Sequence, residues 1–154
     1  MKNKLAIIVA ACASILAFST LSLAQQQKCS EPGSIKRIIK ARAGNFETVT
    51  FEVVPPSPDF KITNAHRPFE NYGGDPVHIK GKYFKEVRFT GVNWTCKISE
   101  NFSAATTTVT GVAQTEQFEG YVTYIVGYRT KSKYIGQSST TSGGIRRIVL
   151  KFKR

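Results

Sequence analysis

The chain has 154 residues, 41% of them hydrophobic, and carries 22 Lys and Arg against 10 Asp and Glu. The formal net charge of +12 favours anionic partners such as cell-wall polymers, lipid headgroups or nucleic acid, but says nothing about the fold. Of the three Cys, the two outside the N-terminal apolar segment are far apart, and with only two His they make a poor metal site. We expect no metal and no other cofactor.

The first residues have the pattern of a signal peptide. Lys2 and Lys4 give a positive start, residues 5–18 are uncharged and apolar, and small residues precede a predicted cleavage between Ala24 and Gln25. The apolar run is too short for a membrane span, so no transmembrane segment is predicted in the mature chain. We expect an exported protein, periplasmic or extracellular, and export disfavours nucleic acid as its partner.

An alternative signal lies inside the same segment. Residues 9–12 (Val-Ala-Ala-Cys) resemble a lipoprotein signal, in which Cys12 would be acylated and would tether the protein. The apolar stretch before Cys12 is very short and apolar residues continue after it, which favours the cleaved signal. Cleavage would leave a segment, residues 25–34, that we expect to be flexible. One domain follows over residues 35–154, long enough for a hydrophobic core.

The mature chain would keep two cysteines, Cys29 and Cys96. An even pair in an oxidising compartment predicts a disulfide. Such a bond would tie the N-terminal segment to the middle of the domain and, in the chain-entropy model, contribute about 4 kcal/mol. A catalytic Cys would need a nearby base, and the sequence nominates none.

Short segments of alternating or β-branched residues predict strands from the start of the domain. Residues 34–42 favour a strand, although their Ile spacing also fits a basic helical turn. After a turn at residues 44–45, residues 46–54 alternate apolar and polar side chains, and the prolines that follow end this strand. Residues 60–63 predict a further short strand.

The middle of the chain is less regular. Residues 64–75 are predicted to be a loop, residues 77–80 a short strand and residues 83–91 a longer one. Residues 93–106 show no clear period, and residues 107–113 favour a strand.

The longest β-branched and aromatic run, residues 119–129, predicts the central strand. Successive side chains of a strand point to opposite faces, so one face carries Val122, Tyr124, Val126 and Tyr128, and the other Tyr121, Thr123 and Ile125. Because both faces are apolar, we expect this strand to be covered on both sides.

The last third of the chain closes the domain. Residues 131–136 predict a short strand, the Ser/Thr-rich residues 137–144 a flexible loop, and residues 145–152 the last strand. No helix of ordinary length is evident. Many short strands with Pro, Gly and Ser turns predict an all-β fold of mainly antiparallel strands, a sandwich or a barrel.

Several segments, taken in order, resemble the AMIN-like domain of exported bacterial proteins. The resemblance extends over residues 35–152 and is carried by residues 44–52, 58–62, 75–81, 87–91, 118–120 (Phe-Glu-Gly), 125–127 (Ile-Val-Gly) and 146–152. The family often has Asp-Arg where this chain has Glu47-Thr48, so an ion pair made there by relatives is not carried over.

The resemblance implies a compact β-sandwich related to the AMIN domains of N-acetylmuramoyl-L-alanine amidases. Those domains are targeting modules that associate with the cell envelope and peptidoglycan and carry no catalysis. The expected function is therefore a non-catalytic exported module that binds peptidoglycan or another anionic wall polymer. The alternative is a periplasmic protein-interaction factor, an inhibitor or assembly partner. A small envelope hydrolase has the least support.

The candidate ligand-binding residues are basic or aromatic and lie after the central strand or on the last one: Arg129, Lys131, Lys133, Tyr134, Arg147, Lys151 and Lys153. If these strands are neighbours, the cations form one positive stripe, and Tyr83, Tyr128 or Tyr134 would stack on sugar rings beside it. The plain alternative is a solvated edge whose charges discourage strand pairing.

No catalytic residue is predicted. His66 and His78 lack a matching set of partners, and the acidic residues have no spacing typical of a general acid/base pair. The Ser/Thr-rich segment around Ser138 lacks a nucleophile elbow. We therefore predict that the chain is not an enzyme.

Overall fold

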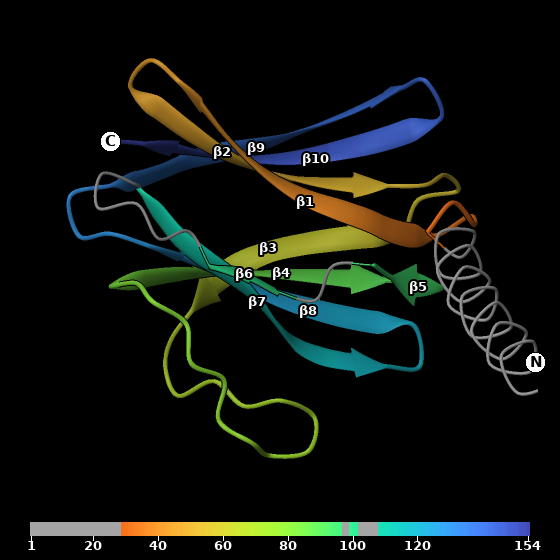
Figure 1. Ribbon diagram of the computed structural model, residues 1–154, viewed down its shortest axis with the longest axis horizontal. Coiled ribbons are helices and arrows are strands. Elements are labelled where there is room, and N and C mark those ends of the chain that lie inside the picture. Colours follow the sequence, from red (N-terminus) through yellow and green to blue (C-terminus); the bar gives the residue numbers. More distant parts are fainter. Residues whose placement is uncertain (1–28, 97–98, 102–107) are drawn as a thin grey trace, which may run out of the picture.

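The computed structural model describes residues 29–96, 99–101 and 108–154. The predicted signal segment, its cleavage site at Ala24 and Gln25, and the Cys12 alternative lie outside the described residues. Within those ranges the chain contains ten strands and no helix, and the strands form two five-stranded sheets packed as two layers (Figure 1). The predicted all-β sandwich is confirmed.

The first sheet has the strand order β5-β1-β2-β10-β9. Its strands are β5 (Trp94–Thr95), β1 (Ser34–Ala43), β2 (Phe46–Val53), β10 (Ile145–Lys153) and β9 (Lys133–Ser142). All neighbours pair antiparallel except β1 and β5, which are parallel.

The second sheet has the order β3-β4-β8-β7-β6 and is antiparallel throughout. Its strands are β3 (Asp59–Ala65), β4 (Tyr83–Thr90), β8 (Tyr121–Tyr128), β7 (Val109–Phe118) and β6 (Ser99–Asn101).

Strand β8 occupies the centre of the second sheet, as predicted. One face points between the sheets, where Val122, Tyr124 and Val126 are buried in the main core. The opposite face places Ile125 in a smaller apolar cluster. Tyr121 differs from the prediction: it is 47% exposed, because it lies next to the β7–β8 turn at the end of the strand.

The centre of the main core is aromatic and joins the two layers. Phe51 of β2 packs against Phe89 of β4 and Tyr124 of β8, with ring centroids 5.4 Å and 5.2 Å away. Burial of each such ring stabilises the fold by about 2 kcal/mol. The last strand contributes as predicted, since Ile148, Leu150 and Phe152 are all buried.

The prediction of a flexible loop over residues 137–144 is wrong. Strand β9 continues to Ser142 and pairs with β10 along its length. A two-residue turn at Gly143 and Gly144, both with positive φ, closes the hairpin, as type I′ turns do. The segment is polar because β9 is an exposed edge strand, and its strand conformation is set by β10 rather than by apolar alternation.

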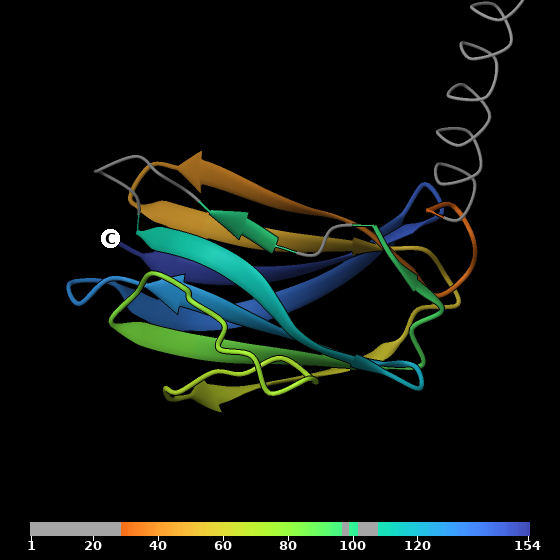
Figure 2. The ribbon, with the colours of Figure 1, turned by 60° about the horizontal axis from the view of Figure 1, so that its bottom comes forward.

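The predicted strand over residues 77–80 is also wrong, because these residues form no ladder. They belong to the connection from β3 to β4, which lies across the outer face of the second sheet (Figures 1 and 2). Ile79 and Val77 pack there against Phe84 and Ile125, with Phe69 completing the cluster. The apolar residues alternate in this segment because it packs against the sheet, although it is not one of the strands.

This connection approaches β8 closely at Gly127. A Cβ added to Gly127 would lie 2.1 Å from the carbonyl oxygen of Lys80, so only glycine allows the approach. Thr110 donates a hydrogen bond to the same carbonyl oxygen, and Arg67 donates one to the carbonyl oxygen of Ile79. The end of the connection is thus fixed against the sheet.

A covalent bond links the segment before β1 to the residue that follows β5, its neighbour in the first sheet. The predicted disulfide between Cys29 and Cys96 is present, with a Cα–Cα distance of 5.8 Å and a sequence separation of 67. A buried carboxylate joins the layers elsewhere: Glu47 of β2 accepts hydrogen bonds from the backbone N–H groups of Thr108 and Val109 at 2.8 Å and 3.0 Å. Glu47 therefore has a structural role in this chain.

Candidate ligand-binding site

Three tyrosines gather where the two sheets meet at one end of the sandwich. The ring centroids of Tyr83 on β4 and Tyr128 on β8 are 5.8 Å apart. Tyr128 and Tyr134 on β9 both pack on Phe152, at 5.1 Å and 5.5 Å. Elements from both sheets therefore place these rings together. The sequence offers each of them as a stacking residue beside the basic stripe, and that role stays a prediction.

Two hollows open around these rings, with volumes of about 500 Å³ and 290 Å³. They share Asn64, Tyr83 and Tyr128 as lining residues, and we refer to them together as the tyrosine cleft. Tyr83 is 46% exposed, so its ring is accessible to a ligand.

The tyrosine cleft is positively charged. Its lining includes the cationic side chains Arg67, Lys82, Lys85 and Lys133. Within the described ranges, no Asp or Glu lines either hollow. A site of this charge attracts an anionic ligand and repels a cationic one.

Lys85 is held in place between the two sheets. Its Nζ donates a hydrogen bond of 2.6 Å to Oδ1 of Asn64 and lies 4.3 Å from the ring centroid of Tyr134. Partial burial lowers the pKa of Lys85, since the charged form is less well solvated there. The cation is therefore preorganised and partly desolvated, which strengthens its attraction to an anionic group.

Two phenols of the cleft, those of Tyr128 and Tyr134, are protonated at neutral pH. Burial raises the pKa of Tyr128 above its ordinary value, and the neighbouring Tyr83 phenol adds to the shift. Burial raises the pKa of Tyr134 in the same way, with Tyr128 as its neighbour. The Tyr128 and Tyr134 phenols are therefore neutral, and the aromatic faces of the cleft suit the apolar faces of sugar rings.

Five of the seven candidate residues lie at or near this end of the molecule. Lys133 and Tyr134 line the tyrosine cleft, and Lys153 is opposite Lys133 in the β9–β10 ladder. Arg129 and Lys131 are exposed in the connection between β8 and β9.

The other two candidates lie outside the cleft on β10. The Lys151 ammonium lies 4.1 Å from the ring centroid of Phe46 on β2, which is diagonal to it in the ladder. Arg147, further along β10, donates a hydrogen bond of 2.9 Å to Glu52, whose side chain is only 3% exposed. Arg37 also pairs with Glu52, so Arg147 serves a structural ion pair.

Sequence reasoning did not single out Asn64, Arg67, Lys82 or Lys85 as binding residues. They lie at the end of β3, in the connection that follows and at the start of β4. These residues come close to Lys133 and Tyr134 only because β4 of the second sheet packs near β9 of the first. The signal available in the sequence is local: Lys82 and Lys85 lie on either side of Tyr83, a predicted stacking residue.

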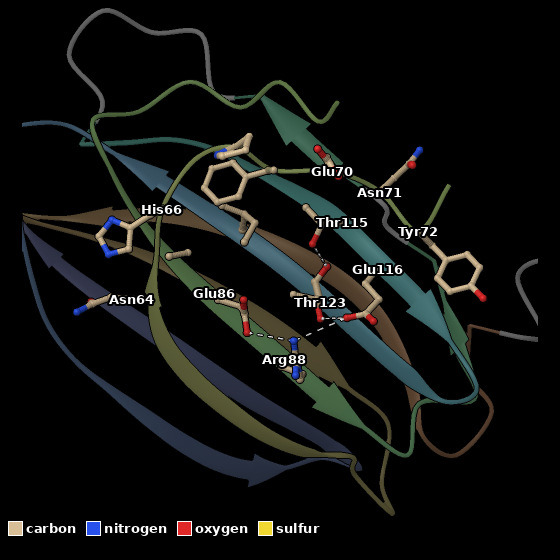
Figure 3. Close-up of a pocket in the computed structure, with 14 residues that line it drawn as sticks. Asn64, His66, Glu70, Asn71, Tyr72, Glu86, Arg88, Thr115, Glu116 and Thr123 are labelled. Carbon is tan, nitrogen blue, oxygen red and sulfur yellow. Dashed lines mark hydrogen bonds and ion pairs between the residues drawn. The ribbon is translucent and has the colours of Figure 1, made fainter. Parts of the chain in front are cut away.

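A third hollow, of about 450 Å³, lies on the outer face of the second sheet (Figure 3). Three glutamates line it, Glu70, Glu86 and Glu116, together with Arg88, and we call it the acidic groove. His66 lies at its edge, away from the charged cluster of Glu86, Arg88 and Glu116 (Figure 3).

Neither the tyrosine cleft nor the acidic groove has the ligand set of a metal site. No group of three or more His, Cys, Asp or Glu in the part of the chain that the structure describes is placed to hold a metal ion. The same ranges contain no helix that is long and apolar enough to cross a membrane.

Comparison with protein families supports the resemblance seen in the sequence. The sequence model of the AMIN-like domain matches residues 34–154, which include all ten strands. Comparison with curated proteins and with solved structures finds no match.

Proposed function

Because this chain belongs to the AMIN-like domain family, we propose that it is a non-catalytic cell-envelope module that binds peptidoglycan or another anionic wall polymer through the tyrosine cleft. AMIN-like domains occur in exported bacterial proteins and are targeting modules related to peptidoglycan. We further propose export with cleavage after Ala24, to the periplasm or the cell exterior.

The observation that carries the proposal is the composition of the tyrosine cleft. Four cationic side chains and three tyrosines line it, and no described acidic side chain does. An anionic group of the polymer would pair with Lys85 and Lys133, while a sugar ring would stack on Tyr83. A charged edge serving solubility alone would not need cations held beside aromatic rings.

A pelleting assay with purified sacculi tests this function. The protein, expressed from its full sequence and purified in the oxidised form, is expected to co-sediment at about 0.15 M ionic strength, where exposed charges are screened beyond about 8 Å. Replacing Tyr83→Ser together with Lys133→Glu should reduce the bound fraction severalfold. Lys36→Glu is the matched control, since Lys36 is exposed on β1 at the other end of the sandwich.

The result can also refute the proposal. Binding that is seen only at low ionic strength would indicate attraction by net charge alone. Equal loss of binding in the Lys36→Glu control would lead to the same conclusion. Release of soluble muropeptides from the sacculi by the pure protein would contradict the non-catalytic role.

A further inference from the structure

The acidic groove lies on the face of the second sheet that points away from the first sheet. The connection from β3 to β4 covers only part of this face (Figure 2). Beside the covered part, side chains of β4, β8 and β7 form the floor of the groove (Figure 3). Arg88, Thr123 and Glu116 are aligned across these three strands by the ladder register.

The charge of the groove is opposite to that of the whole chain. Three glutamates and one arginine line it, on a chain with a formal net charge of +12. Lys61 is opposite Arg88 on β3 but does not line the hollow. An anionic wall polymer would be repelled here, and a cationic group would be attracted.

The carboxylates of the groove retain acceptor capacity for a ligand. Nη2 of Arg88 lies 3.6 Å from Oε1 of Glu86 and 3.9 Å from Oε2 of Glu116, which is too far for hydrogen bonds. Thr123 donates a hydrogen bond of 2.9 Å to Oε2 of Glu116 and so orients it. Each carboxylate has about four acceptor positions, so an incoming ammonium or guanidinium would find oxygens to bind.

An exposed aromatic rim borders the groove. Tyr72 stacks on Phe118 with ring centroids 4.9 Å apart and an interplanar angle of 8°, although the two residues are 68% and 43% exposed. Tyr121 is opposite Phe118 in the ladder and is also exposed. Ring faces beside carboxylates attract cations, and exposed aromatic groups are typical of protein interfaces.

From this juxtaposition we propose that the acidic groove binds an extended segment of a protein partner that carries Lys or Arg. The cationic head of the side chain pairs with Glu86 and Glu116, and its methylene stem lies on Tyr72. The groove therefore gives the module a protein ligand in addition to a wall polymer. This interaction does not depend on the tyrosine cleft.

Binding of short synthetic peptides tests the inference. A labelled peptide of alternating Lys and Thr is titrated with the full protein in fluorescence anisotropy at about 0.15 M ionic strength. Saturable binding is expected, and Glu116→Gln and Tyr72→Ser should each weaken it about fivefold to tenfold. Glu31→Gln changes the charge equally at an exposed site outside the groove and should leave the affinity unchanged.

Each remaining outcome overturns the proposal. The first such outcome is that the Lys peptide does not bind, or that it binds equally to the wild type and to Glu116→Gln. The second is that a matched peptide of alternating Glu and Thr binds with the same affinity as the Lys peptide. Self-association of the protein that Glu116→Gln abolishes, without peptide binding, would make a second copy the occupant. Soluble glycan fragments that displace no peptide but shift the NMR signals of Thr123 and Glu116 would assign the groove to carbohydrate.

Discussion

The smaller hollow of the tyrosine cleft and the acidic groove lie on opposite faces of the second sheet, and strand β4 contributes to both. The larger hollow of the cleft reaches round to the outer face, where Phe84 lines it. Tyr83 and Lys85 line the cleft, whereas Glu86 and Arg88 line the groove. Since side chains alternate between the faces of a strand, the adjacent residues Lys85 and Glu86 give two surfaces of opposite sign. A single basic net charge therefore describes this molecule poorly, because binding depends on which face a ligand meets.

The two hollows also share one support, the connection between β3 and β4. Asn64 and Ala65, the last residues of β3, and His66, the first residue of the connection, line both the acidic groove and the larger hollow of the cleft. The end of the connection is fixed by the close approach of Lys80 to Gly127. A change at this contact should affect both surfaces together.

Gly127→Ala is expected to have the largest effect. Its Cβ would require the Lys80 carbonyl to move, and overpacking of this kind costs about 1–3 kcal/mol. Thermal unfolding should show a lower melting temperature, and NMR should show shifts around both hollows. A variant with an unchanged melting temperature and unchanged spectra would show that the contact does not position the connection.

The adjacent substitutions Lys85→Gln and Glu86→Gln would separate the two hollows. Lys85→Gln should weaken sacculus binding several-fold and leave binding of the Lys peptide unchanged, because its side chain faces the cleft. Glu86→Gln should do the reverse. Each variant is the control for the other, with sacculus binding measured by pelleting and peptide binding by anisotropy. If either variant lost both kinds of binding, the two surfaces would not act independently.

The smallest expected effect concerns a cluster that belongs to neither hollow. Hydrogen bonding from Arg37, assisted by Arg147, lowers the pKa of Glu52 below its ordinary value of 4.5, against the opposing effect of burial. A lowered pKa in the folded state means stability that is present above the unfolded pKa and lost as the pH falls through the folded value.

Denaturant unfolding as a function of pH measures this contribution. The wild type should lose about 1 kcal/mol more than Glu52→Gln on acidification, since both arginines are largely exposed and their pairing is screened. Sacculus binding by Glu52→Gln should equal that of the wild type at neutral pH. An identical pH dependence in the two proteins would rule out the contribution of this ion-pair cluster.

Features encoded within a single strand were predicted from the sequence. The alternation of β8 identified its central place and the burial of Tyr124 and Ile125, because each side chain's face follows from its position alone. The inward face of β10 followed in the same way. Strand β9 was missed over residues 137–144, because its polar residues adopt the strand conformation by pairing with β10.

The candidate site was predicted only in part, for a similar reason. Local patterns pointed to Lys133 and to the three tyrosines, but Asn64 and Lys85 join them only through the packing of the two sheets. The acidic groove was not predicted at all. Its floor depends on the register between strands, which places Glu116 near Arg88 although they are far apart in sequence.

The most direct test of the central proposal is an NMR titration of the full protein with soluble peptidoglycan fragments at about 0.15 M ionic strength. Binding through the tyrosine cleft predicts shifts for the amides of Tyr83, Tyr128 and Lys133, which line the cleft and not the groove, with Glu86 and Glu116 little affected. Shifts confined to the acidic groove, or no saturable shift at all, would contradict it.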